Sequence, residues 1–178
     1  MEINMQNNWL ILTLVGEDRP GIVANIARVL FAVGAELGEA AMMRLGGQFA
    51  IMMMVRSAGS PEDVIGLLES TRMAFDLKLH VDETDASLHQ AREADVLVTV
   101  HGADRAGIVA EVTAALVESG LNILDLRSDV GGTLAAPIYI MQIEGEARQG
   151  IDAIEATIAA LGAQGLSVRI TPLDTVRG

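Results

Sequence analysis

The sequence contains no cysteine among its 178 residues and few aromatic side chains, which make up 3% of the chain. Disulfide bonds, thiolate metal ligands and cysteine nucleophiles are therefore excluded. Hydrophobic residues still account for 51% of the sequence, including nine methionines. The core must therefore be built mainly from aliphatic side chains and methionine.

Basic residues are also scarce, because 12 lysines and arginines face 24 aspartates and glutamates, giving a formal net charge of −12. Such a charge repels phosphate backbones, whereas proteins that bind DNA directly normally present a face rich in lysine and arginine. An acidic, solvated surface also keeps a protein in solution. We therefore expect no direct contact with nucleic acid.

Long hydrophobic runs are missing as well. No segment approaches the roughly 18 uninterrupted apolar residues of a membrane-spanning helix. The first residues, Met1-Glu2-Ile3-Asn4, lack the basic and then apolar pattern of a signal peptide. We expect a cytoplasmic protein without a membrane contact.

An internal repeat organises the rest of the chain. The sequence Gly-Glu-Asp-Arg-Pro-Gly-Ile-Val-Ala begins at Gly16 and recurs as Gly-Ala-Asp-Arg-Ala-Gly-Ile-Val-Ala from Gly102, an offset of 86 residues. This period predicts two domains, which we place at residues 1–83 and 95–178, joined by a polar linker at 84–94. Domains of that size are only marginally stable alone, so we expect them to pack on each other or on another chain, as in a homodimer.

Each repeat begins with an apolar strand and continues into a helix. Residues 9–15 form an apolar run that suits a buried strand, and apolar residues then recur at helical spacing from Ile22 to Val33. We expect Asp18 to be available as a helix cap, with Pro20 in the first helical turn. Residues 96–100 and 108–116 repeat this order.

The remainder of each repeat predicts two strands, a helix and a last strand. Gly46-Gly47 and Gly131-Gly132 are expected to be hairpin turns, and Ser60-Pro61-Glu62-Asp63 has the pattern of a capped helix start. Pro137 fits only at a strand start or edge. The order β-α-β-β-α-β in both halves predicts an α+β protein with two ferredoxin-like domains, each an antiparallel four-stranded sheet with two helices on one face.

No catalytic motif accompanies this fold. The sequence has no P-loop, no HExxH and no GxSxG. Its three histidines, His80, His89 and His101, are not paired along a helix. We therefore expect no enzyme, no cofactor and no bound metal.

The repeated loop can support binding, because it leads directly into a helix N-terminus. Unpaired N–H groups and the positive end of the helix dipole can bind a carboxylate or a phosphate there. Alternatively, Asp18 and Asp104 only cap their helices, a common arrangement worth about 1 kcal/mol each. Arg19 and Arg105 could pair with an anion or simply face solvent. The residues alone leave both interpretations open.

A second candidate position follows the first helix of each repeat. Asn122 carries both a hydrogen-bond donor and an acceptor and could contact an amino group, or it could be an ordinary turn residue. Repeat 1 has Glu36 at the equivalent place.

Taken together, the two β-α-β-β-α-β halves, the Asp18-Arg19-Pro20-Gly21-Ile22-Val23 loop and the Gly120-Leu121-Asn122-Ile123 stretch resemble the ACT domain, a small amino-acid-sensing module. The resemblance covers nearly the whole chain. The tandem pair without a catalytic domain, together with residues 44–49, looks most like the glycine cleavage system transcriptional repressor group. The loop alone is less specific, since ACT domains attached to phosphoserine phosphatase and formyltetrahydrofolate deformylase carry similar loops.

This resemblance implies that an amino acid binds between modules, with its carboxylate on the backbone amides of the first strand-to-helix loop and its amino group near the start of the second strand. The ligand-binding residues it implies are Asp18, Arg19, Gly21, Ile22, Asp104, Arg105, Gly107, Ile108 and Asn122. Two positions depart from the pattern. Ala106 replaces the loop proline in repeat 2, and Glu36 replaces the customary asparagine in repeat 1, so if only one site binds we expect it in repeat 2.

The function implied by the resemblance is that of a non-catalytic regulator. It would bind a small amino acid, glycine or similar, and control a transcription regulator by protein contact, which agrees with the acidic charge. The alternative is a structural or regulatory interaction subunit of a metabolic enzyme that senses no amino acid itself.

Overall fold

The computed structural model describes residues 8–57, 59–85, 92–133, 136–163 and 165–173. The chain divides into two compact units, residues 1–90 and 91–178, and each is described by itself. Residues 86–91 of the predicted linker and the outer ends of both predicted domains lie outside the described residues. The domain boundaries at residues 83 and 95 therefore stay predictions.

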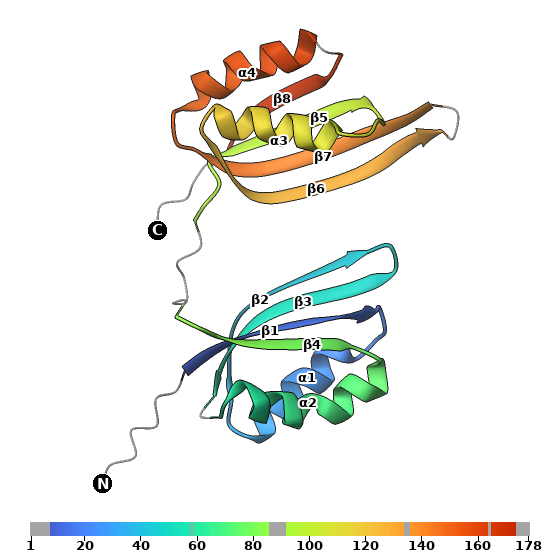
Figure 1. Ribbon diagram of the computed structural model, residues 1–178, viewed down its shortest axis with the longest axis vertical. Helices are drawn as coiled ribbons and strands as arrows, with labels where there is room; N and C mark the ends of the chain where they lie inside the picture. The colour runs from blue at the N-terminus through green and yellow to red at the C-terminus, as the bar shows by residue number, and fades with distance from the viewer. Residues whose placement is uncertain (1–7, 58, 86–91, 134–135, 164, 174–178) are drawn as a thin grey trace. The chain divides into compact units, whose positions relative to one another are not determined.

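The first unit is a four-stranded antiparallel sheet with the strand order β2-β3-β1-β4. Both helices lie on one face of this sheet (Figure 1). Its elements are β1 (Asn8–Glu17), α1 (Ile22–Ala32), β2 (Glu36–Leu45), β3 (Gln48–Ser57), α2 (Pro61–Phe75) and β4 (Lys78–Thr84).

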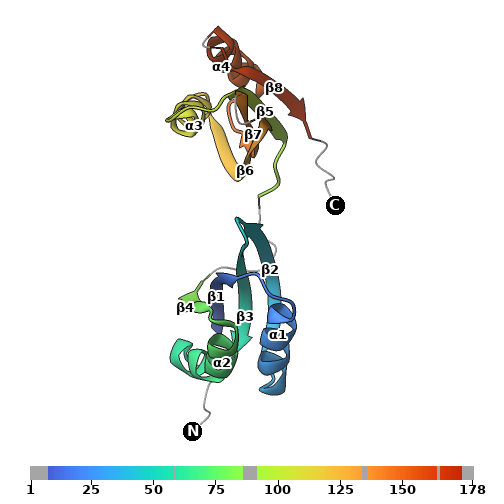
Figure 2. The same ribbon diagram turned by 90° about the vertical axis from the view of Figure 1, so that its right-hand side faces the viewer.

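The second unit repeats this arrangement with the strand order β6-β7-β5-β8, and Figure 2 shows the same layering from a second direction. Its elements are β5 (Val96–Ala103), α3 (Ile108–Glu118), β6 (Leu121–Thr133), β7 (Ala136–Ala147), α4 (Ile151–Ala163) and β8 (Ser167–Pro172). The predicted α+β class and the two ferredoxin-like domains are therefore confirmed.

Each core lies between the sheet and its two helices. Alternate residues of β1 point to that side because side chains alternate across a strand. Leu10, Leu12 and Leu14 are at most 1% exposed. They lie opposite Val55, Met53 and Ile51 of β3, and they share a core with Ile26 and Leu30 of α1 and with Val64 and Leu68 of α2. Val96, Val98 and Val100 of β5 are buried in the same way.

The start of α1 differs from the sequence prediction. The helix begins at Ile22, and its N-cap is Gly21 with φ 94°, in the left-handed region that glycine tolerates best. Pro20 therefore precedes the cap and is not in the first turn. None of the described side chains caps α1, and the prediction that Asp18 is a cap is wrong, because Asp18 lies three residues before the N-cap.

The second repeat enters its helix in the same way. Gly107 is the N-cap of α3 with φ 86°, and in the described part of this unit no side chain caps the helix. Asp104 is therefore not a cap either. By contrast, α2 has the predicted capping box, in which Ser60 accepts from the N–H of Asp63 and the Asp63 carboxylate accepts from the N–H of Ser60.

The two hairpins also differ. Gly46 and Gly47 form the predicted turn, with φ values of 58° and 77°. In the second unit, β6 continues through Gly131-Gly132 to Thr133, and Gly132 pairs with Pro137 in the ladder. The predicted turn at Gly131-Gly132 is therefore wrong, because both glycines are paired with β7, at Ile138 and Pro137. Pro137 lies at the start of β7, as predicted.

The strand registers show which residues of the two repeats are equivalent. Gly16 lies opposite Phe49, and Gly102 lies opposite Tyr139. Residues of β3 therefore correspond to residues of β7 that are 90 positions later, although β1 and β5 differ by 86. The second hairpin is longer by four residues, and a comparison of the sites must allow for this.

Candidate functional site

A cavity of about 320 Å³ lies beside the N-terminus of α1. It is formed by the β1–α1 loop, the first turn of α1, the end of β2 and the start of β3. Its lining residues are Asp18, Arg19, Gly21, Ile22, Val23, Ala24, Met42, Arg44 and Phe49. All four ligand-binding residues predicted in repeat 1 (Asp18, Arg19, Gly21 and Ile22) therefore meet around one cavity.

The backbone at this cavity is a helix N-terminus that no side chain of the described residues caps. The first N–H groups of a helix have no acceptor within the helix, and the residues of the first turn, Ile22 to Ala24, line the cavity. No acidic residue lies in this first turn. The positive end of the helix dipole is therefore available to an anion.

Two arginines and two carboxylates surround this helix end. The Arg44 guanidinium on β2 contacts the Asp18 carboxylate, with 3.0 Å between Nη1 and Oδ2. Arg19 instead binds Glu17, with 2.6 Å between Nη2 and Oε2. This hydrogen bond to Glu17 raises the pKa of Arg19 above its ordinary value. Arg44 and Asp18 thus form the pair of opposite charges among the lining residues.

The rest of the lining is apolar. Ile22 and Phe49 are both 2% exposed and belong to the core, so they form a fixed wall. Met42 on β2 is 56% exposed and lines the same cavity. The site therefore combines a positive helix end, one paired carboxylate and guanidinium, and the exposed aliphatic and thioether side chains of Val23 and Met42.

Sequence reasoning missed Met42, Arg44 and Phe49 as site residues. Arg44 and Phe49 belong to the hairpin stretch 44–49, which carries part of the family resemblance but no signal for binding. The available signal was the Gly46-Gly47 turn, which folds the end of β2 back beside β3, while β3 pairs with the end of β1.

The corresponding place in the second unit has different side chains. Arg44 pairs with Phe49 across the hairpin, and Val130 pairs with Tyr139, so Val130 occupies the position of Arg44. Arg105 is bound by Glu111 of α3. The structure thus keeps Asp104, Arg105, Gly107 and Ile108 on one loop and helix start, but it places a valine where repeat 1 has an arginine.

Asn122 lies far from that loop within its own unit. It is the second residue of β6 and pairs with Glu146, whereas Asp104 follows the end of β5. Strands β5 and β6 are both antiparallel to β7 and therefore run in the same direction. Since β5 has eight residues at about 3.3 Å each, more than about 20 Å separates Asn122 from the loop.

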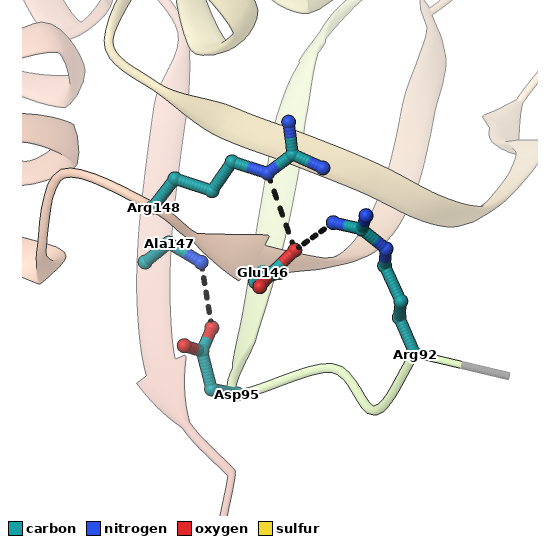
Figure 3. Close-up of polar contacts among 5 residues, drawn as sticks. All are labelled: Arg92, Asp95, Glu146, Ala147 and Arg148. Carbon is teal, nitrogen blue, oxygen red and sulfur yellow. Dashed lines mark hydrogen bonds and ion pairs between the residues drawn. The ribbon is translucent and has the colours of Figure 1, made fainter. Parts of the chain in front are cut away.

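The surroundings of Asn122 form a charged network at the start of β5 (Figure 3). Glu146 accepts hydrogen bonds from Arg92 Nη1 at 3.0 Å and from Arg148 Nε at 3.2 Å. These two bonds lower the pKa of Glu146. Beside it, the Asp95 carboxylate accepts from the Ala147 N–H at 2.8 Å. These contacts join Arg92 and Asp95, which precede β5, to the end of β7.

Glu36 occupies the place equivalent to Asn122 in repeat 1. It forms an ion pair with Arg56, the residue opposite it on β3. The Arg56 guanidinium also lies over the Trp9 ring, 5.5 Å from its centroid. The Glu36 carboxylate is therefore engaged within its own sheet.

The described residues contain no group of three or more histidine, aspartate or glutamate residues placed to hold a metal ion. None of the helices in that part of the chain is long and apolar enough to cross a membrane.

Comparison with known proteins gives consistent matches. A family model described as the ACT domain matches residues 8–82 and 94–171. Over 125 residues the chain is 30% identical to the glycine cleavage system transcriptional repressor of Escherichia coli (strain K12) and equally to that of Shigella flexneri. These alignments cover 68% of this chain and 64% of each relative, so the match spans less than two thirds of the relatives' length.

A solved structure extends the likeness to the whole fold. The crystal structure of an unknown protein from Galdieria sulphuraria superposes with a TM-score of 0.71 and covers 94% of this chain and 99% of that one. Sequence identity is 20%, so this likeness concerns the fold alone.

Proposed function

Because this chain belongs to the ACT domain family, whose modules are regulatory rather than catalytic, we propose that it is a regulatory protein that binds a small amino acid beside α1 of the first unit. The family match over most of the chain supports the regulatory role. The observation that carries the proposed site is the cavity in which Asp18, Arg19, Gly21 and Ile22 meet at an uncapped helix N-terminus.

The chemistry of an amino acid fits this lining. Its carboxylate would accept hydrogen bonds from the first N–H groups of α1, where the helix dipole favours a negative charge. Its ammonium group would bind the carboxylate of Asp18. Charge-assisted hydrogen bonds of this kind are the strong ones in proteins, so a small zwitterion can be bound without a large contact area.

The proposed site lies in repeat 1, although the sequence alone favoured repeat 2. Val130 takes the position of Arg44 in repeat 2, and Glu111, which binds Arg105, lies in the first turn of α3, where α1 has no acidic residue. Both differences reduce the positive charge offered to a carboxylate. Asn122 and Glu36 have no part in the site of a single unit, and a role for Asn122 would need a second module.

The proposed output is a change in affinity for a protein partner. A ligand shifts a conformational equilibrium only if it binds the two states with different affinities. Two curated relatives are named as transcriptional repressors, and we propose by analogy that the partner here is a transcription regulator. The net charge of −12 supports protein contact rather than DNA contact. A homodimer in the cytoplasm is part of the same proposal.

The test is thermal unfolding of the full chain with each of the twenty amino acids at millimolar concentration. A ligand that binds only the native state raises the melting temperature, so at least one amino acid should do so. Asp18→Asn should abolish the shift, whereas Asp104→Asn, the matched change in repeat 2, should leave it intact. If no amino acid stabilises the protein, the proposed function is wrong.

A further inference from the structure

Part of the cavity beside α1 is lined by apolar side chains, which a bound glycine would leave uncovered. Val23 and Met42, which are 41% and 56% exposed, contribute apolar surface to it, while the charged groups lie around the helix end. We propose, on the basis of the function above, that this site prefers amino acids with an apolar side chain over glycine, and that Arg44 is a specificity-determining residue that binds the ligand carboxylate.

The size of the cavity supports a ligand with a side chain. Its volume of about 320 Å³ lies at the lower end of the range for small-molecule sites, about 300 to 1,000 Å³. A glycine bound to the helix end would leave the exposed apolar side chains of Val23 and Met42 in contact with water. An aliphatic side chain removes that surface from water, and a single methylene group in an apolar pocket changes affinity by about 10- to 200-fold.

The Arg44 and Asp18 pair explains why the ligand must carry both charges. In the structure the two side chains neutralise each other at 3.0 Å. A zwitterion can separate them and still give each charge a partner, since its carboxylate binds Arg44 and its ammonium group binds Asp18. A simple carboxylate or a simple amine would form only one of these two charge-assisted hydrogen bonds.

The second repeat provides a natural comparison for Arg44. Val130 occupies the matching position on β6, and Ser128 occupies that of Met42. Repeat 2 therefore lacks both the guanidinium and the flexible apolar side chain that repeat 1 offers. Arg44→Val transfers the residue of repeat 2 into repeat 1, and it is the most direct variant for the test.

The experiment is isothermal titration calorimetry of the full chain with leucine, glycine, isovalerate and 3-methylbutylamine. We expect leucine to bind at least about tenfold more tightly than glycine. Isovalerate and 3-methylbutylamine share the apolar chain but carry a single charge, and each should bind at least about tenfold more weakly than leucine, because one charged hydrogen bond is lost.

Variants then test the role of Arg44. Arg44→Val should weaken leucine binding at least about tenfold. Arg127→Val removes an equal charge from an exposed arginine of β6 that pairs with its own neighbour Asp125, and it should leave leucine binding unchanged. Circular dichroism checks the fold, and Arg44→Gln replaces Arg44→Val if the valine variant does not fold.

The outcomes separate this inference from the proposed function. Glycine binding as tightly as leucine, or leucine binding that is unaffected by both Arg44 variants, would overturn the inference and leave amino-acid binding intact. Absence of binding by every amino acid would instead contradict the proposed function itself.

Discussion

The guanidinium of Arg44 contacts the carboxylate of Asp18 across 26 residues of sequence, with 3.0 Å between Nη1 and Oδ2. The Arg44 side chain is 67% exposed and that of Asp18 is 34% exposed. Exposed pairs of this kind contribute only about 0 to 1 kcal/mol to stability. The pair can therefore be separated by a ligand at little cost to the fold, which suits residues of a binding site.

The N-caps of α1 and α3 are glycines in the left-handed conformation, so replacing either by alanine should destabilise the protein. Gly21→Ala and Gly107→Ala should each lower the free energy of unfolding by about 1 kcal/mol or more, because a Cβ atom is unfavourable at positive φ. Among the described residues, an added Cβ atom at Gly21 would lie 3.5 Å from Asn25 Nδ2, and one at Gly107 would have no neighbour within 4 Å. Urea unfolding measures the backbone effect.

A third glycine gives the control for these variants. Gly66 lies inside α2 without a positive φ, and a Cβ atom there would meet open space. Gly66→Ala should raise the free energy of unfolding by about 0.5 to 1 kcal/mol, because glycine is a poor helix former. The same sign for all three variants would contradict the assigned backbone geometry.

Gly102 of β5 lies against Leu166, the residue that precedes β8, so a larger side chain at position 102 should overpack this contact. A Cβ atom there would lie 2.5 Å from Leu166 Cδ2, and Leu166 is only 5% exposed. Gly102→Ala should therefore destabilise the second unit by about 1 to 3 kcal/mol. Combined with Leu166→Ala, it should cost less than the sum of the two single changes, because the larger neighbour is gone. Strictly additive costs in chemical unfolding would argue against this contact.

The network of Figure 3 predicts a pH dependence. Hydrogen bonds from Arg92 and Arg148 lower the pKa of Glu146 in the folded state. This group therefore contributes stability above its unfolded pKa, and the contribution is lost as the pH falls through the folded pKa. Arg92→Gln should raise the pKa of Glu146 toward its ordinary value, as followed by NMR titration of the side-chain carboxyl carbon. Arg127→Gln should not change that titration.

The capping assignments predict different costs for two similar truncations. Ser60→Ala removes the hydroxyl that accepts from the Asp63 N–H and should cost about 1 kcal/mol. Asp18→Ala removes no cap and only an exposed ion pair, so its cost should be within about 1 kcal/mol and should fall at high salt. If Asp18→Ala lowered the free energy of unfolding by more than Ser60→Ala does, and independently of salt, Asp18 would have a structural role.

The features that the sequence predicted correctly depend on neighbouring residues. Ser60 to Asp63 form a capping box within four consecutive positions, and Gly46-Gly47 form a two-residue turn. Strand and helix order follow from apolar periodicity in the same way. Such signals need no knowledge of the rest of the chain.

The features that were missed or wrong depend on geometry that the sequence leaves open. Asp18 has the residue type of a cap, but the left-handed conformation of Gly21 places the cap three residues later. Gly131-Gly132 suits a turn or a strand, and the ladder to Pro137 decides between them. Arg44 reaches Asp18 only because the hairpin register aligns β2 with the end of β1, which no local pattern encodes.

The bulges near the starts of β2 and β6 have a consequence for association between molecules. Both are edge strands, and their ladders shift register between Leu37 and Ala40 and between Ile123 and Asp125. A bulge bends an edge strand and interrupts its regular hydrogen-bonding groups. An added strand from another chain would therefore lose its pairing at that point, which protects these edges against open-ended, aggregating sheet growth.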